Sequence, residues 1–127
     1  MSTPTAPYRV VLVDDAADLR LLVGQLLERD GRFAVVGQAA DGAEGIRTAS
    51  EHQPDLCVLD LSMPVMDGLE ALPRILEECP TTKVVILSGL DAGQMEATAL
   101  RLGAAGYLEK GAAFARLADM LAEIAAG

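Results

Sequence analysis

The feature that most constrains the fold of this 127-residue chain is a regular alternation between short apolar runs and longer stretches with helical periodicity. The apolar runs, several of them rich in β-branched residues, predict strands at 9–13, 33–37, 56–61, 83–87 and 106–110. A stretch with helical spacing follows each run. Five strand–helix units in succession predict an α/β domain, built on a doubly wound parallel sheet of five strands with five helices.

Each helix is expected to bury one face, and turn-forming residues mark the helix ends. Gly31 and Gly103 are expected to stop the first and fourth helices, Asp41 to cap the second, and Pro80 to close the third. Pro73 falls inside the third helix, where it predicts a kink or a distorted first turn. The apolar residues at helical spacing are Leu19, Leu22, Val23, Leu26 and Leu27; Ile46 and Ala49; Leu69, Leu72, Leu76 and Cys79; Met95, Ala99 and Leu102; and Phe114, Leu117, Leu121 and Ile124.

Polar side chains stand at the ends of four predicted strands. Asp14-Asp15 follows the first strand, Asp60 interrupts the third one residue before its end, Ser88 ends the fourth and Lys110 ends the fifth. Because parallel strands end at the same edge of a sheet, these groups are expected to meet in one crevice. Crowded carboxylates must bind a cation or hold a proton, since like charges raise each other's pKa. A hard divalent ion such as Mg²⁺ suits such an all-oxygen site.

Each of these residues also has a plainer interpretation. Taken singly, the acidic pair is a helix cap, Asp60 a turn cap, Ser88-Gly89 a turn and Lys110 a solvated strand end. Four such features at the ends of different strands are improbable as a coincidence. The joint pattern therefore favours a functional site.

Composition excludes several classes of protein. The formal net charge of −9 repels phosphate backbones, so direct nucleic-acid binding is not expected, and the apolar runs are far too short to span a membrane. Residues 1–7 have no basic start and no hydrophobic centre, and we expect a disordered lead-in before a domain over 8–127. Cys57 and Cys79 lack metal-site spacing and are expected to be packing thiols, and the cytoplasm is the default compartment.

From about Tyr8 to the end, the chain resembles the receiver domain of bacterial two-component response regulators. The resemblance rests on Asp14-Asp15, Asp60, Ser88 and Lys110. It implies the flavodoxin-like strand order 2-1-3-4-5. The runs D-L-S-M-P-V-M-D-G-L-E-A-L and G-A-A-G-Y-L-E-K resemble the subfamily whose receivers precede a LuxR-type helix-turn-helix.

This resemblance implies a role for each residue. Asp60 would be the phosphoacceptor, Lys110 would pair with the acyl phosphate, Ser88 would follow the phosphoryl group and Tyr107 would be an aromatic rotamer switch. The Mg²⁺ ligands would be Asp14, Asp15, Asp60 and the backbone oxygen of Ser62. The donor would be the phosphohistidine of a sensor histidine kinase or a small acyl phosphate. The chain has no G-x-x-x-x-G-K-S/T loop for ATP, and its one histidine, His52, is remote from the motif.

The resemblance further implies a signalling domain that catalyses only its own phosphorylation and slow dephosphorylation. Its readout and homodimer surface would be the face made by the fourth helix, fifth strand and last helix, and its output would be transcription. A stand-alone receiver and a longer regulator both fit. Gly111 stands where the family usually has proline, which predicts a trans peptide bond after Lys110 and a differently shaped loop.

Two other classes of function compete with this interpretation. One is a receiver-like binding module that is never phosphorylated, against which the complete set of acidic, hydroxyl and ammonium groups argues. The other is a Mg²⁺-dependent phosphatase with an aspartyl nucleophile. That chemistry needs a second aspartate two residues after the nucleophile, where this chain has Ser62.

Overall fold

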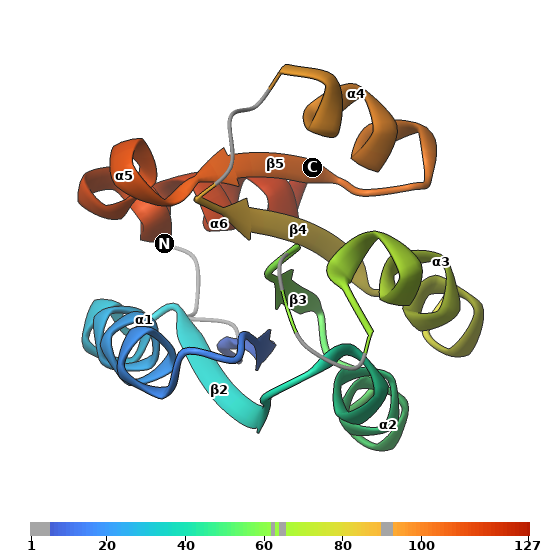
Figure 1. Ribbon diagram of the computed structural model, residues 1–127. Coiled ribbons are helices and arrows are strands. Elements are labelled where there is room, and N and C mark those ends of the chain that lie inside the picture. The colour runs from blue at the N-terminus through green and yellow to red at the C-terminus, as the bar shows by residue number, and fades with distance from the viewer. Residues whose placement is uncertain (1–5, 62, 64–65, 90–92) are drawn as a thin grey trace.

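The computed structural model describes residues 6–61, 63, 66–89 and 93–127. Its centre is a five-stranded sheet in which every neighbouring pair of strands is parallel (Figure 1). The strands are β1 Tyr8–Val13, β2 Phe33–Ala39, β3 Leu56–Leu59, β4 Lys83–Ser88 and β5 Gly106–Glu109, in the order β2-β1-β3-β4-β5. The predicted flavodoxin-like fold is confirmed, and β2 extends two residues beyond its predicted end at Gly37.

Helices connect and follow the strands. They are α1 Ala17–Asp30, α2 Gly42–His52, α3 Gly68–Glu78, α4 Gly93–Arg101, α5 Lys110–Ala113, the 3-10 turn η1 Phe114–Arg116 and α6 Leu117–Ala126. The sequence predicted one continuous last helix, whereas that unit is divided into α5, η1 and α6. Large apolar residues at helical spacing begin only at Phe114. Phe114 lies in the 3-10 turn, and Leu117, Leu121 and Ile124 follow on α6, the helix that packs on the sheet.

The sheet divides the core into two half-cores. Helices α2, α3 and α4 cover one face, and α1 and α6 cover the other (Figure 1). Side chains alternate along each strand, so Val84 and Ile86 of β4 belong to the α2-side half-core and Val85 and Leu87 to the α1-side half-core. This explains why the strands have apolar runs without alternation: both faces are buried.

The helix ends follow the predicted local chemistry. Gly31 ends α1 with a φ of 90°, in the left-handed region that glycine adopts readily. Asp41 caps α2 by accepting the Glu44 N–H, and Asp67 caps α3 by accepting the Glu70 N–H. Helix α3 continues across Pro73, which is its sixth residue and thus lies beyond a distorted first turn. The structure therefore excludes the prediction that Pro73 lies in a distorted first turn.

Two leucines predicted on buried helix faces are exposed. Leu22 is 51% exposed, because it lies at the margin of the stripe formed by Leu19, Val23 and Leu27. Leu102 is 39% exposed, because α4 ends at Arg101 and no longer directs that side chain toward the core.

Both cysteines are buried, as predicted for packing thiols. Burial, with a smaller contribution from Cys79, raises the pKa of the Cys57 thiol to about 12. Among the described residues, no helix is both long enough and apolar enough to cross a bilayer. Of the predicted lead-in, residues 1–5 lie outside the described part of the chain.

Candidate functional site

The carboxyl ends of β1 and β3 lie side by side, and their register sets the spacing of the acidic residues. Val13 pairs with Leu59, and the Asp60 N–H donates to the Val13 carbonyl at 2.9 Å. Carboxylate oxygens of Asp14, Asp15 and Asp60 lie within 4.8 Å of one another. Asp14 and Asp60 are 7% and 4% exposed, while Asp15 faces solvent. The predicted convergence of these three carboxylates is therefore present.

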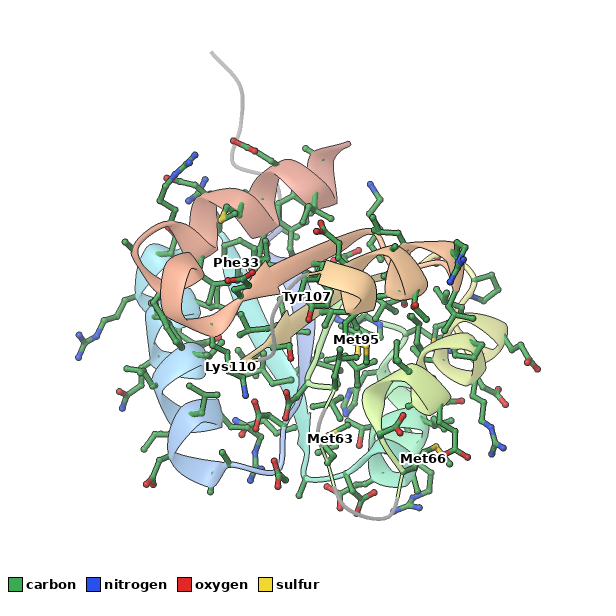
Figure 2. All side chains as sticks on the ribbon, turned by 45° about the horizontal axis from the view of Figure 1, so that its top comes forward. Phe33, Met63, Met66, Met95, Tyr107 and Lys110 are labelled. Atoms are coloured by element: carbon green, nitrogen blue, oxygen red, sulfur yellow. The ribbon has the colours of Figure 1, made fainter. Side chains whose placement is uncertain are left out.

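Lys110 reaches this cluster from the first residue of α5 (Figure 2). Its Nζ lies 3.1 Å from Asp14 Oδ2 and 3.4 Å from Asp60 Oδ1. Burial by itself lowers the pKa of Lys110, but the hydrogen bond to Asp14 and the charges of Asp60 and Asp14 outweigh it and raise this pKa. The ammonium is therefore charged at neutral pH. The stability that it contributes is lost only as the pH rises above the usual titration range of lysine.

The cluster forms the wall of a cavity of about 250 Å³ at the edge of the sheet. The lining residues are Asp14, Asp15, Ala16, Asp60, Ser88, Gly89 and Lys110. Ser88 is fully buried at the end of β4. Four strand ends thus contribute to one cavity, as the parallel topology predicted.

Among the described residues, Tyr107 is the predicted site residue that does not line this cavity. Tyr107 is 9% exposed and belongs to the α2-side half-core. Met95 packs against the same half-core, and Figure 2 shows both residues on the side where α4 lies. Ser62 lies outside the described residues, so its predicted role as a backbone ligand stays a prediction.

Asp14 is held at four points. Its N–H donates to the Ala39 carbonyl at 3.0 Å, and its Oδ1 accepts the Ala16 N–H at 2.9 Å. Its Oδ2 pairs with Lys110, and its backbone carbonyl accepts a hydrogen bond from Arg20 Nη1. Sequence reasoning missed Arg20. The available signal was an arginine in the first turn of a helix, where the helix dipole makes a cation unfavourable unless a nearby group compensates it.

The donor set fits a hard divalent cation. Carboxylate oxygens with water completing the coordination shell are what Mg²⁺ takes in proteins, and this cavity opens to solvent beside Asp15. The three carboxylates share the ammonium of Lys110, so a further cation would find oxygen ligands there. Asp14, Asp15 and Asp60 are the residues that would hold it.

Comparison with known proteins identifies the family. The model of the response regulator receiver domain matches residues 10–122. The chain belongs to this family. The acidic cluster and Lys110 therefore lie in a receiver domain, at the edge of the sheet where the strand pattern predicted them.

Three similar proteins illustrate the range of the family. A protein-glutamate methylesterase/protein-glutamine glutaminase of Maricaulis maris is 45% identical over 104 residues, which cover 80% of this chain and 26% of that protein. The chain thus spans about a quarter of that relative. The structure of a LuxR-family two-component response regulator from Aurantimonas sp. SI85-9A1 is 33% identical, with a TM-score of 0.90, covering 96% of this chain and 87% of that one. The CheX-CheY-BeF3-Mg²⁺ complex from Borrelia burgdorferi is 28% identical, with a TM-score of 0.87, covering 93% and 89%.

The residue after Lys110 has room for a side chain. The Lys110–Gly111 peptide bond is trans, as predicted, and a Cβ at Gly111 would meet nothing within 4 Å. Gly111→Ala is expected to raise the free energy of unfolding by about 0.4–1 kcal/mol, because alanine has less conformational entropy to lose on folding. Urea denaturation measures this change. A lower midpoint would show that position 111 needs a conformation open only to glycine.

Proposed function

We propose that this receiver accepts a phosphoryl group on Asp60 and that the modified domain controls an output. The observation that carries the proposal is the shared ion pair: Lys110 bridges the buried carboxylates of Asp14 and Asp60 at the wall of an open cavity. A cationic partner favours the ionised form of a carboxylate. An ionised carboxylate is the nucleophile from which an aspartyl phosphate forms.

In the proposed step, an Asp60 oxygen attacks the phosphorus of a phosphohistidine or of a small acyl phosphate. A P–O bond to Asp60 forms while the P–N bond to the imidazole, or the P–O bond to the acyl group, breaks. The leaving group takes the electron pair, and a departing imidazole takes a proton from solvent. Lys110 offsets charge on the phosphoryl oxygens, which together with positioning is the main requirement of this transfer.

A divalent cation completes the proposed site. Asp14, Asp15 and Asp60, with the backbone oxygen of Ser62, would hold Mg²⁺. When bound, it would supply a second positive centre against the incoming phosphoryl group. The similarity to a CheY solved with BeF3 and Mg²⁺ supports this part of the proposal.

The proposed readout begins at Ser88, whose hydroxyl would donate to the new phosphoryl oxygens, and Tyr107, which already lies inward in this structure, would be the aromatic switch near it. One or two charge-assisted hydrogen bonds contribute about 1.5–3 kcal/mol each. Moving an equilibrium from 1:99 to 99:1 takes about 5.5 kcal/mol. Phosphorylation would therefore shift a balanced equilibrium of the face made by α4, β5 and α6 without remaking the fold.

The partners follow from the chemistry. We propose a sensor histidine kinase as donor, in the cytoplasm, and a homodimer through the face made by α4, β5 and α6. Transcription is the proposed output, supported by the similarity to a LuxR-family regulator. The methylesterase relative makes control of an enzyme the second candidate output.

Labelling with acetyl phosphate tests the acceptor. We expect Mg²⁺-dependent phosphorylation of the wild-type chain, observed by intact-mass spectrometry, and its loss in Asp60→Asn. The matched control is Asp55→Asn. Asp55 precedes β3 at the opposite edge of the sheet, where it accepts the Arg9 N–H, so this variant should label normally.

Two results would contradict the proposal. Labelling retained in Asp60→Asn would place the acceptor elsewhere. A wild-type chain that never labels, with acetyl phosphate or with a phosphorylated kinase, would favour the unphosphorylated binding module.

A further inference from the structure

Arg20 contacts the candidate metal site through the backbone of Asp14. It is the fourth residue of α1, and its backbone N–H donates to the Ala16 carbonyl at 3.0 Å. Its side chain turns back to the sheet, where Nη1 donates to the Asp14 carbonyl and Nε donates to Gln38 Oε1 at 3.3 Å. One guanidinium thus joins the first turn of α1, the end of β1 and the end of β2.

Without its hydrogen-bond partners, Arg20 would destabilise the fold at this position. The amino end of a helix carries partial positive charge, so a cation in the first turn destabilises that helix. Arg20 is also half-buried, and with Leu12, Val58 and Leu87 it lines a small cavity of about 10 Å³ beneath Asp14 and Asp60. The hydrogen bonds to Asp14 and Gln38 and the nearby carboxylates compensate these costs. The arginine is therefore bound to this site rather than to solvent.

Arg20 does not line the cavity that would receive the phosphoryl group. Its effect must pass through Asp14, the residue whose carbonyl it holds. The Asp14 carboxylate is fixed by Ala16 and Lys110, but that rotamer is useful only if the backbone of Asp14 stays in place. The planar guanidinium, with several donors in a rigid arrangement, can hold Asp14 and Gln38 at once.

We infer that Arg20 is a positioning residue for the divalent-cation site: it fixes the backbone of Asp14, through a contact with Gln38, so that the acidic cluster is preorganised for Mg²⁺. This inference rests on the proposed function. It assigns no contact between Arg20 and the ion or the phosphoryl group.

A simple charge effect predicts the opposite result. If Arg20 acted only as a positive charge near the carboxylates, removing it would strengthen the attraction for Mg²⁺, and lysine would replace it fully. If Arg20 acts by positioning, removing it weakens Mg²⁺ binding, and lysine restores only part of the affinity because one ammonium cannot reproduce the two-sided contact. The direction of the change in Mg²⁺ affinity therefore distinguishes a positioning role from a simple charge effect.

Calorimetric titration with MgCl₂ measures this direction without phosphorylation. We expect Arg20→Met to raise the dissociation constant for Mg²⁺ by about tenfold, the lower end of what loss of an outer support costs a metal site. Arg20→Lys should lie between that variant and wild type. Gln38→Ala should weaken binding in the same direction by less, and the Arg20→Met/Gln38→Ala double variant should be no weaker than Arg20→Met alone.

Arg29→Met is the matched control, because it removes the same charge from the exposed last turn of the same helix and should change the dissociation constant less than twofold. Affinity in Arg20→Met that equals or exceeds wild type overturns the inference while the proposed function stands. If the wild-type chain binds no Mg²⁺, the inference and the proposed function are both contradicted. If thermal melting shows that Arg20→Met does not fold, Arg20→Lys and Gln38→Ala decide, and unchanged affinity in both overturns the inference.

Discussion

Replacing Lys110 with methionine is expected to lower the rate of phosphorylation by acetyl phosphate at least about 100-fold, as the loss of one preorganised charge-stabilising donor does in other active sites. Methionine retains much of the length and the apolar stem of lysine, but it removes the ammonium that pairs with Asp14 and Asp60. Time courses of labelling at saturating Mg²⁺ measure the effect. Mg²⁺ binding itself should tighten, because the cation no longer shares the carboxylates with a lysine.

The same variant should acquire a new pH dependence of stability. Without the ammonium, the three clustered carboxylates repel one another when they are charged, which raises the free energy of the folded state more than that of the unfolded chain. Neutralising carboxylates at low pH removes this repulsion. Lys110→Met should therefore be less stable than wild type at pH 7, and the difference should shrink as the pH falls toward the carboxyl range. Urea denaturation at several pH values measures this trend.

Lys83→Met is the control for both measurements. Lys83 is the other lysine of the chain, and its Nζ donates to the carbonyls of Ile124 and Ala125 at the end of α6. Its loss should destabilise the fold without changing labelling or Mg²⁺ affinity. Wild-type labelling in Lys110→Met would contradict the assigned role of Lys110.

Gly68→Ala is expected to destabilise the fold by about 3 kcal/mol or more, the upper range for overpacking a buried position. A Cβ on Gly68 would lie 2.2 Å from the Asp60 carbonyl oxygen and 2.8 Å from Leu61 Cα, and neither backbone atom can rotate away. The Gly68 N–H also donates to the Leu61 carbonyl at 2.9 Å, so the start of α3 cannot move without losing that hydrogen bond. Urea denaturation monitored by circular dichroism gives the change in free energy.

The consequence should extend to the site, because the clash is with Asp60 itself. Slower labelling is expected in the fraction of Gly68→Ala that remains folded. Gly111→Ala provides the comparison, since it adds the same methyl group where nothing lies within 4 Å. If the two alanine variants had equal stability, the close approach of α3 to β3 would be wrong.

The acidic cluster was predictable because topology alone determines it. Once five strand–helix units imply a parallel sheet, the residue after each apolar run must lie at one edge. Asp14, Asp60, Ser88 and Lys110 could therefore be brought together without coordinates. The buried faces of most helices followed from periodicity in the same way.

Other features depended on packing that periodicity does not contain. The exposure of Leu22 and Leu102 depends on where the buried stripe of α1 is centred and where α4 ends. The division of the last helix depends on which residues after β5 have apolar surface to bury. Arg20 was not predicted because helical spacing assigns a first-turn arginine to solvent, and only the packing of α1 beside the ends of β1 and β2 brings the Asp14 carbonyl and Gln38 within its reach.

The division of the core into two half-cores affects how such a domain can evolve. Asp60 continues the alternation of Val58 on the α1 side, whereas Ser88 continues that of Val84 and Ile86 on the side of Tyr107. The proposed acceptor, Asp60, thus lies on the opposite face of the sheet from Ser88 and Tyr107, which are proposed to report its phosphorylation. Asp60 and Ser88 meet at the cavity on the edge of the sheet. If the proposed function holds, acceptance and reporting are separable traits, and substitutions under α4 would redirect the domain to a new output while the acceptor chemistry is inherited intact.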